Sequence, residues 1–551
     1  MKSVELNNDF KPRIYQQTIF SNCIFKNSFV VLPTGLGKTV IALLLSVFYY
    51  NKYNKKILFL APTKPLVEQQ KKSFEKFIKN SEEFNLTILT GQTSPKKRMQ
   101  IYTDNNFVFS TPQVIENDIL SKHIDLNDFC FCIFDEAHRG VGNYAYCFIS
   151  NEISKINNFY TLCLSASPGS DMEKIEEVFS NFFIDHTEIK KENDKDIKSY
   201  INETKIEKIE VELDSFQNEI KNDLQKTLKN RIDELKYFNF VNQNQNTLTK
   251  TEILNLQGFL RSQLQVKKSN DLFDAISISS GIMKLIHGIE LFETQDFQVC
   301  FGYFLNFFKK NETRAVLEIS RNIHFRNAID KIEMLHKNNT NHPKIEKLKL
   351  LVKEQVERNK NLKIIIFSSY REIAKKIEKQ INQIENIKSS IFVGQSKKNE
   401  VNFSQKKQKE IIQKFRDGEL NVIISTSVGE EGLDIPQVDL VIFYEPTPSA
   451  IRTIQRIGRT GRFSKGHVLM LITKYTRDQI NTYVSNKKEK KMYVCLEKIK
   501  KKFEKNSNKD TNGLKKFFNN NKDNTEKNNT KYIELSNEDF SYIEKNLELR
   551  K

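Results

Sequence analysis

Two stretches of the chain alternate short β-rich runs with amphipathic helical segments, and this alternation constrains the fold more than any other feature. In the first stretch, the β-rich runs are residues 29–32, 57–61, 107–110, 130–135 and 160–166. In the second stretch, they are residues 363–369, 390–393, 421–426, 440–444 and 467–473. A strand, a helix and a strand at this spacing are typical of a doubly wound, mainly parallel sheet. The sequence therefore predicts two α/β domains.

The segments outside these stretches follow other patterns. From about residue 200 to 340 no β-rich run is evident, and apolar spacings such as those of residues 276–286 favour helices packed on one another. After about residue 480, a basic helical pattern puts four apolar residues on one face: Met492, Leu496, Ile499 and Phe503. Lys and Asn then dominate to about residue 530, which predicts disorder.

A chain of 551 residues is long enough for several hydrophobic cores. The predicted α/β domains are residues 1–200 and 341–485, with a helical insert at 201–340 and a basic helix plus largely disordered tail at 486–551. The expected fold class is thus α/β, with two doubly wound parallel-sheet domains, an inserted helical domain and a disordered basic tail.

The chain carries 87 Lys and Arg residues against 69 Asp and Glu residues, a net charge of +18. This excess suits a polyanionic partner such as nucleic acid, although a general bias toward Lys and Asn would give the same value. The apolar runs, such as residues 40–47, are too short to cross a bilayer, and the N-terminal residues lack the apolar core of a secretory signal. We therefore expect a cytoplasmic protein without a membrane partner.

The 7 cysteines are scattered, without the spacing of a metal or redox motif. Cys130 and Cys132 stand two apart in the apolar run 129–134, so regular alternation would put both on one face of the strand as small hydrophobes. The sequence therefore predicts neither a metal-binding nor a disulfide role for them.

The loop Leu32–Thr39 follows a predicted strand and precedes the apolar helix 40–47. Gly35 and Gly37 allow the backbone to turn and to aim N–H groups at phosphate, at the positive end of a helix. Lys38 would then reach the β and γ phosphates of ATP, and the Thr39 hydroxyl would bind Mg²⁺. Leu32 stands where the strict phosphate-loop pattern has its first glycine.

Two further elements complete this nucleotide site. Asp135 and Glu136 follow a buried strand, which suits one acid that holds Mg²⁺ and a second that orients and deprotonates the attacking water. In the second α/β domain, the segment Gln455–Arg462 spaces its arginines so that they can project from one helix into a facing cleft and stabilise charge on the γ-phosphate. Glycines at 458 and 461 would be unfavourable in a plain surface helix.

Together these segments resemble a superfamily 2 helicase, in which two RecA-like domains close over ATP. The resemblance covers roughly residues 10–480, with the motifs in the expected order. Leu32–Thr39 resembles motif I, Asp135–His138 motif II in its DEAH form, Ser165–Gly169 motif III, and Gln455–Arg462 motif VI. Ala61–Leu66 resembles motif Ia, Ser110–Gln113 motif Ib, and Thr426–Pro436 motif V.

The resemblance implies a role for each matching position. The catalytic residues would be Lys38, Asp135, Glu136, Arg459 and Arg462, with Thr39 and Asp135 as the metal ligands. The nucleotide would also contact Arg13, Gln16, Leu32, Pro33, Thr34, Gly35, Leu36, Gly37, Lys38, Thr39, Gly432 and Asp434, with Gln16 reading the adenine. The residues that couple hydrolysis to movement would be His138, Ser165, Ser167 and Gln455.

The implied nucleic-acid contacts come from loops that follow strands, where open α/β sheets bind ligands. These residues are Thr63, Lys64, Thr111, Tyr370, Arg371 and Thr426. Their contacts would be to phosphate and sugar, so binding should depend strongly on salt and weakly on sequence.

A finer resemblance, to the archaeal Hef and Fanconi anaemia M-type helicases, rests on residues 135–146, 164–170, 289–295 and 342–348. It implies a motor that acts on branched DNA such as forks and Holliday junctions, with a helical insert that grips a duplex arm. Archaeal members often continue into a nuclease domain, and nothing after Thr473 resembles one. We therefore expect motor activity without cleavage, with any nuclease supplied by a separate partner.

A second functional class stays open. Innate-immune RNA sensors share the inserted helical architecture, so the chain could be an ATPase stimulated by duplex RNA that acts as a binding switch. Those sensors would be expected to carry a zinc-binding C-terminal domain, and this sequence has neither the cysteine pairs nor the length for it. DNA is therefore favoured.

The tail contains one apolar cluster, Leu514 followed by Phe517 and Phe518. It resembles the PIP box that docks into a sliding clamp, with Thr511 in place of the usual Gln. A chance cluster explains it equally well.

Overall fold

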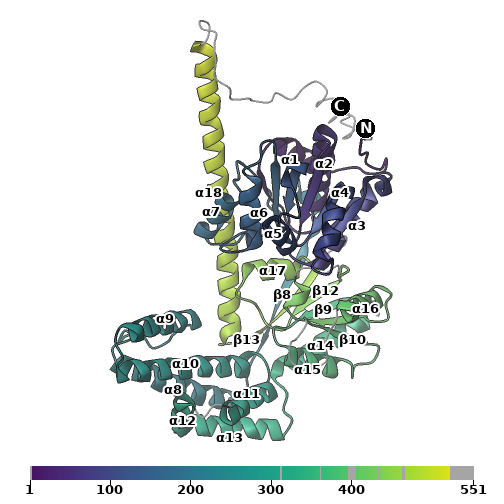
Figure 1. Cartoon of the computed structure of the whole chain (residues 1–551). Coiled ribbons are helices and arrows are strands. Elements are labelled where there is room, and N and C mark those ends of the chain that lie inside the picture. Colours follow the sequence, from purple (N-terminus) through teal and green to yellow (C-terminus); the bar gives the residue numbers. More distant parts are fainter. Residues whose placement is uncertain are drawn as a thin grey trace.

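The computed structural model describes residues 3–310, 313–359, 361–394, 405–430, 435–461 and 466–520, and for residues 307–310, 405 and 503–520 the backbone only. Two α/β domains lie one above the other in Figure 1, with a group of helices beside the second and a long helix running past both. This arrangement confirms the predicted fold class of two parallel-sheet domains with a helical insert.

The first domain contains a seven-stranded sheet in the order β3-β4-β2-β5-β6-β1-β7, and every neighbouring pair is parallel. Its strands are β1 (Ser28–Val31), β2 (Lys56–Leu60), β3 (Leu86–Leu89), β4 (Phe107–Ser110), β5 (Phe129–Phe134), β6 (Tyr160–Ser165) and β7 (His186–Ile189). The five predicted strands are confirmed, and the two that the sequence did not predict, β3 and β7, form the edges of the sheet.

Helices cover both faces of this sheet. They are α1 (Ile14–Cys23), α2 (Lys38–Tyr53), α3 (Lys64–Phe77), α4 (Pro95–Asp104), α5 (Pro112–Leu120), α6 (Ala145–Ile153) and α7 (Met172–Asn181). Helices α1, α2 and α3 pack on one face, and α4 to α7 contribute to a second apolar cluster on the other. Burial on both faces explains why the central strands are continuous apolar runs.

A β-bulge in β5 overturns one expectation about the cysteines. Lys56 of β2 is opposite Phe129, but the next residue, Ile57, is opposite Phe131, so the register skips Cys130. The extra residue breaks the alternation of side chains. As a result Cys130 lies in the cluster on the α2 face and Cys132 in the cluster on the opposite face, and not on one face as predicted.

The second domain contains a six-stranded parallel sheet in the order β10-β11-β9-β12-β13-β8. Its strands are β8 (Thr204–Val211), β9 (Ile364–Phe367), β10 (Ser389–Phe392), β11 (Val422–Ser425), β12 (Leu440–Phe443) and β13 (Gly466–Thr473). Its helices are α14 (Pro343–Arg358), α15 (Arg371–Ile381), α16 (Gln405–Arg416) and α17 (Ala450–Ile457).

Strand β8 corrects the predicted boundary at residue 201. It precedes the insert in sequence, but all eight of its residues pair with β13, so it belongs to the second sheet and not to the insert. Most of its side chains are exposed or half-buried, because β8 lies at the edge of the sheet and has a neighbouring strand on one side only. Its charged, weakly apolar sequence therefore gave no recognisable strand pattern.

The insert is a helical bundle, as predicted. Its helices are α8 (Ser215–Tyr237), α9 (Lys250–Val266), α10 (Asn270–Thr294), α11 (Phe297–Lys310), α12 (Arg314–Arg321) and α13 (Ile323–Lys337). They enclose two apolar clusters, and α10 contributes to both. Within the described residues, α10 alone is long and apolar enough to cross a membrane, but 56% of the relevant window is buried, as in the core helix of a bundle.

The last helix, α18 (Arg477–Asn520), begins where the second sheet ends and packs on the first domain. Met492, Cys495, Leu496 and Ile499 are buried in the apolar cluster that covers β7 and α7. In Figure 1 this yellow helix runs alongside both α/β domains. Its backbone is helical to Asn520, beyond the predicted pattern that ends at Phe503, while residues 521–551 of the predicted tail lie outside the described residues.

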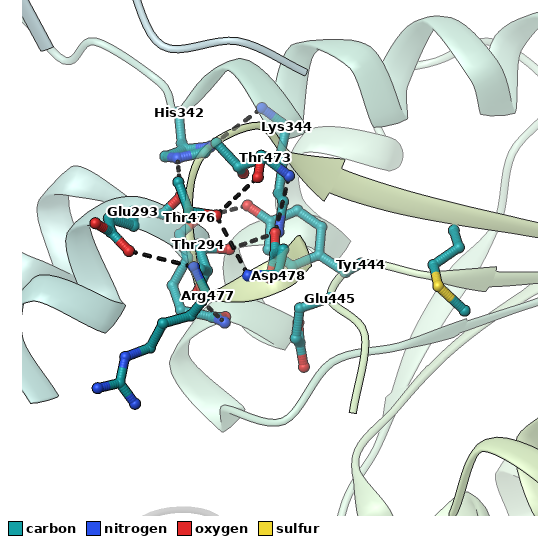
Figure 2. Close-up of polar contacts among 12 residues, drawn as sticks. Glu293, Thr294, His342, Lys344, Tyr444, Glu445, Thr473, Thr476, Arg477 and Asp478 are labelled. Carbon is teal, nitrogen blue, oxygen red and sulfur yellow. Dashed lines mark hydrogen bonds and ion pairs between the residues drawn. The ribbon is translucent and has the colours of Figure 1, made fainter. Parts of the chain in front are cut away.

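A buried polar cluster joins the insert, the second domain and α18 (Figure 2). We call it the junction cluster: Lys221, Glu293–Asp296, His342, Lys344, Lys376, Tyr444, Thr473, Thr476 and Asp478. Lys344 is fully buried, pairs with Asp478 and donates from Nζ to the Thr294 carbonyl at 3.0 Å. Lys376 Nζ donates to Asp296 Oδ2 at 2.6 Å, and Tyr444 Oη donates to the Gln295 carbonyl at 2.5 Å. These contacts fix the end of α10 on the second sheet.

Candidate active site

The phosphate loop connects β1 to α2 through two residues in left-handed conformations. Gly35 has φ 83° and Gly37 has φ 73°, values that only glycine adopts readily. A Cβ on Gly37 would also lie 2.5 Å from Gln16 Nε2. Helix α2 starts at Lys38, so the loop ends at a helix N-terminus as predicted.

Two residues of helix α1 hold the phosphate loop by hydrogen bonds to its backbone. Tyr15 Oη donates to the Leu36 carbonyl at 2.7 Å, and Gln16 Nε2 donates to the same oxygen at 3.1 Å. Gln16 Oε1 accepts from the Arg13 backbone N–H at 2.9 Å, and the Arg13 guanidinium lies 4.7 Å from the centre of the Tyr200 ring. Both ends of the Gln16 amide therefore hold partners within the first domain, and its predicted contact with adenine stays a prediction.

Asp135 lies at the end of β5 with only 4% of its surface exposed. Its Oδ1 accepts from the Glu136 backbone N–H at 3.0 Å, and its Oδ2 accepts from Gln70 Nε2 at 3.0 Å. Burial, reinforced by the charge of Glu136, raises the pKa of Asp135 to about 7, and the charge of Lys38 opposes this shift. A buried carboxylate beside a second acid suits a hard cation such as Mg²⁺.

Lys38 Nζ donates to the Leu32 carbonyl at 3.4 Å, across the base of the loop. Thr39, the second residue of α2, is half-buried. The loop residues and Asp135 therefore form one group at the same edge of the first sheet, as the sequence predicts. Their roles toward ATP and Mg²⁺ stay predictions.

Glu136 is connected to the third motif through His138. Glu136 has φ 51°, a strained conformation for a residue with a side chain, and its Oε2 lies 3.3 Å from His138 Nδ1. The same nitrogen lies 3.1 Å from Ser165 Oγ, which accepts from the Ser167 backbone N–H at 3.2 Å. One ring nitrogen that faces two oxygens can donate to only one at a time. The arrangement suits the predicted coupling role of these residues.

The second domain contacts the phosphate loop through α17. A Cβ on Gly458 would lie 2.3 Å from Thr34 Oγ1, so only glycine allows this approach. Ile454 of α17 packs on the first domain's apolar cluster, and Gln455 is buried. The site therefore contains residues from both domains.

Sequence reasoning missed the residue that holds two arginines of motif VI. Glu430 Oε1 accepts from Nε of Arg456 at 2.8 Å, and the Glu430 carbonyl accepts from Nη2 of Arg459 at 2.6 Å. Arg456 is buried and its guanidinium lies 5.0 Å from the centre of the Phe367 ring. The signal in the sequence was the acid of motif V, which precedes the segment that we assigned to nucleotide contacts.

Some predicted residues lie outside the described part of the chain. Arg462, Gly432 and Asp434 belong to this group, so their roles stay predictions. Leu514, Phe517 and Phe518 lie on the described backbone of α18, but their side chains lie outside the described residues.

The predicted nucleic-acid residues follow strands in both sheets. Thr63 and Thr111 are the N-caps of α3 and α5, Lys64 is the first residue of α3, and Arg371 and Thr426 follow β9 and β11. Lys64 Nζ donates to Gln92 Oε1 at 2.5 Å, and Arg371 donates to the Gly394 carbonyl. Thr426 is buried, with 6% exposed.

Tyr370 lies differently from the other five. Its ring centre is 6.1 Å from that of His287 in α10, and it packs against the apolar clusters of both the insert and the second domain. Burial raises the pKa of its hydroxyl. Tyr370 thus faces the insert, and its predicted contact with nucleic acid stays a prediction.

Three domain families match successive parts of the chain. Residues 9–170 match the family described as "Type III restriction enzyme, res subunit", and residues 344–464 match "Helicase conserved C-terminal domain". Residues 216–339, which form the insert, match "Putative ATP-dependent RNA helicase, helical bundle".

A solved structure decides the family. The crystal structure of the Hef helicase domain of Pyrococcus furiosus is 40% identical to this chain with a TM-score of 0.67, and the match covers 86% of this chain and 98% of that one. The chain belongs to the Hef family of helicases. It is therefore an ATP-hydrolysing helicase, as the order of its motifs predicts.

Longer relatives of the Hef family contain a region that matches most of this chain. A Methanocaldococcus jannaschii protein named "Putative ATP-dependent RNA helicase MJ1505" is 38% identical over 492 residues, which cover 89% of this chain and 61% of that protein. The Schizosaccharomyces pombe protein "ATP-dependent DNA helicase fml1" is 35% identical over 487 residues, 84% of this chain and 57% of that protein. The chain thus spans about three fifths of these relatives' length.

Proposed function

We propose that this Hef-family helicase uses ATP and Mg²⁺ to move along and remodel branched DNA, such as forks and Holliday junctions, in repair and recombination. The main support for the proposal is the site between the two domains, where Gly458 lies against Thr34. In the same site, His138 connects the acid Glu136 to Ser165 of the third motif. The name of the S. pombe relative supports DNA as the substrate.

In the proposed mechanism each residue has a separate task. Lys38 and the loop around it would hold the phosphates, and Thr39 with Asp135 would hold Mg²⁺, which would supply positive charge to offset that of the phosphates. Glu136 would orient the attacking water and accept its proton. Once Glu136 has accepted the proton, the carboxyl group beside His138 is neutral. Because Nδ1 of His138 lies between Glu136 and Ser165, the histidine can then change its hydrogen-bond partner.

The second domain would sense the same event from the opposite side. Arg459 and Arg462 would stabilise charge on the γ-phosphate, and loss of this phosphate would weaken the attraction between the two domains. Thr63, Lys64, Thr111, Arg371 and Thr426 follow strands of the two sheets, so opening and closing would change the spacing between the two sets of DNA contacts.

Duplex RNA is the second candidate substrate. One relative and the family of the helical bundle both carry RNA helicase in their printed descriptions. In that case the chain would be an ATPase that switches its binding state on duplex RNA.

One experiment separates the two candidates. ATP hydrolysis would be measured with single-stranded DNA, forked DNA, a Holliday junction and duplex RNA of matched length. We expect the branched DNAs to stimulate most, and we expect Glu136→Gln to lower the rate by about 10² to 10⁴. Stimulation by RNA alone would overturn DNA as the substrate, and wild-type rates in Glu136→Gln or Lys38→Ala would mean that the site is wrong.

We also propose two protein partners, a separate nuclease and a sliding clamp that binds Leu514, Phe517 and Phe518. A titration of the clamp with wild-type protein and with the triple-alanine variant tests the second partner. Equal affinity of the two proteins would exclude these residues as the docking segment.

A further inference from the structure

Helix α3 connects a predicted DNA contact to the metal-binding acid. Its N-cap is Thr63 and its first residue is Lys64, both predicted to contact the DNA backbone. Gln70 lies six residues after Lys64, which corresponds to about 9 Å along the helix axis. Val67 and Phe74 of the same helix are fully buried in the domain core, so a displacement at the start of α3 would be transmitted along the helix as one rigid element.

The side chain of Gln70 is 8% exposed and points at the acid. Its Nε2 donates to Asp135 Oδ2 at 3.0 Å. Its Oε1 is buried and has no hydrogen-bond partner among the described residues. A buried carbonyl without a partner destabilises a protein by about 1–3 kcal/mol, so an apolar residue would suit this position better if packing were its only role.

The same helix also contacts the second domain. Glu68, two residues before Gln70, accepts from Lys409 Nζ of α16 at 2.7 Å and lies 3.9 Å from Lys64 Nζ. Within about two turns, α3 therefore carries the predicted DNA contact, an ion pair to the other domain, and the amide that holds Asp135.

We propose that Gln70 is a positioning residue that links DNA bound at Thr63 and Lys64 to the orientation of the Asp135 carboxylate. A shift of α3 when DNA binds would move the Gln70 amide, and the carboxylate oxygen that it holds would turn with it. DNA would thus stimulate hydrolysis partly by setting the metal ligand in place. This inference rests on the proposed function, because it requires DNA stimulation.

The test compares Gln70→Met with Gln69→Met. Methionine matches the length of glutamine without its hydrogen bonds, and Gln69 is the half-buried neighbour that makes no contact with Asp135 in the described residues. Gln70→Asn, whose amide is too short to reach, is a second variant in case the first fails to fold. Thermal unfolding of all three variants checks their folding.

Two measurements are made on the full chain. The first is the kcat of ATP hydrolysis without DNA and with saturating forked DNA. The second is the affinity for a fluorescent ADP with Mg²⁺, again without and with forked DNA. The ratio of these two affinities gives the coupling between the nucleotide site and the DNA site. Wild-type coupling in such systems is typically about 5- to 150-fold.

We expect both Gln70 variants to bind forked DNA within about twofold of wild type, yet to lose about tenfold in DNA stimulation and to show a coupling ratio near one. Gln69→Met should match wild type. Wild-type stimulation and coupling in the Gln70 variants would overturn the inference, as would equal losses of kcat with and without DNA. Absence of stimulation in the wild-type protein would instead refute the proposed function, and with it this inference.

Discussion

Two polar clusters in this molecule differ in whether their buried acids are paired with cations. In the junction cluster each of three buried acids faces a cation: Asp478 faces Lys344, Asp296 faces Lys376, and Glu293 faces Lys221 at 4.0 Å. In the catalytic cluster, which we define as Lys38, Gln70, Asp135, Glu136, His138 and Ser165, two acids stand next to each other in sequence and in space. Asp135, Asp296 and Asp478 are all buried, so for these acids the difference lies in charge balance and not in burial.

Unpartnered atoms do not separate the two clusters. Each contains buried oxygens without a hydrogen-bond partner in the described residues: Gln70 Oε1 and Glu136 Oε2 in the catalytic cluster, and Gln295 Oε1, Thr473 Oγ1 and Asp478 Oδ1 in the junction cluster. The net charge does separate them, because Asp135 and Glu136 face one cation, Lys38, whereas the three acids of the junction cluster face three cations. A buried negative charge that is not compensated favours the binding of a cation. We infer that the imbalance marks the ligand site and that the balanced cluster is structural.

The largest expected effect is the loss of one cation from the junction cluster. Lys344→Met would leave the Asp478 carboxylate buried without its partner, which typically destabilises a protein by about 3–5 kcal/mol. Urea unfolding followed by circular dichroism would measure the change. Because α10, α14 and α18 meet there, the insert should also lose its fixed position on the second domain.

The matched control is Lys349→Met on the same helix. Lys349 is partly exposed and its Nζ lies 3.7 Å from Glu346, so its removal should change stability by less than about 1 kcal/mol. The double variant Lys344→Met with Asp478→Leu removes both charges and should recover most of the loss. If Lys344→Met were as mild as Lys349→Met, the charges would not stabilise the junction cluster.

The catalytic cluster could be predicted from the sequence, and the junction cluster could not. Asp135, Glu136 and Lys38 stand in short contiguous motifs whose chemistry is local. The junction cluster collects residues from six separate segments: α8, the end of α10, the start of α14, α15, the end of β12, and the segment that joins β13 to α18. No single segment carries a recognisable pattern, so only the folded chain brings its charges together.

The strands show a similar division. The ten predicted strands include every interior strand of both sheets, because burial on two faces leaves continuous apolar runs. The three that sequence reasoning missed, β3, β7 and β8, are all edge strands with partly exposed side chains. Gln70 and Glu430 were missed for another reason, since each acts through a side chain distant in sequence, Asp135 or Arg456.

The second prediction is that an Asp→Asn substitution has opposite effects on the free energy of unfolding in the two clusters. Asp135→Asn removes an uncompensated buried charge, so without Mg²⁺ and nucleotide it should stabilise the fold by about 1–3 kcal/mol while it abolishes hydrolysis. Asp478→Asn leaves Lys344 unpaired and should destabilise the fold. Urea unfolding in EDTA measures both. Destabilisation by Asp135→Asn would contradict our comparison, because it would mean that the acid is balanced within the protein.

The smallest expected effect is a pH dependence at His342 in the junction cluster. His342 Nε2 donates to the Glu293 carbonyl at 3.2 Å, and its Nδ1 accepts from the Lys344 backbone N–H at 3.2 Å, so both nitrogens are used by the neutral ring. Burial, with the nearby charge of Lys344, lowers the pKa of His342 to about 3. The unfolded chain, with a histidine pKa of about 6.5, therefore takes up a proton that the folded chain refuses as the pH falls.

The stability that neutral His342 provides is thus complete above about pH 6.5 and decreases toward pH 3, by up to about 1.4 kcal/mol per pH unit. His342→Asn keeps an N-cap for α14 without a titrating ring. The difference in unfolding free energy between wild type and this variant should fall by about 2 kcal/mol from pH 7.5 to pH 5. A difference that stays constant over this range would show that the junction cluster accepts another positive charge beside Lys344, and its charges would then not be balanced as we infer.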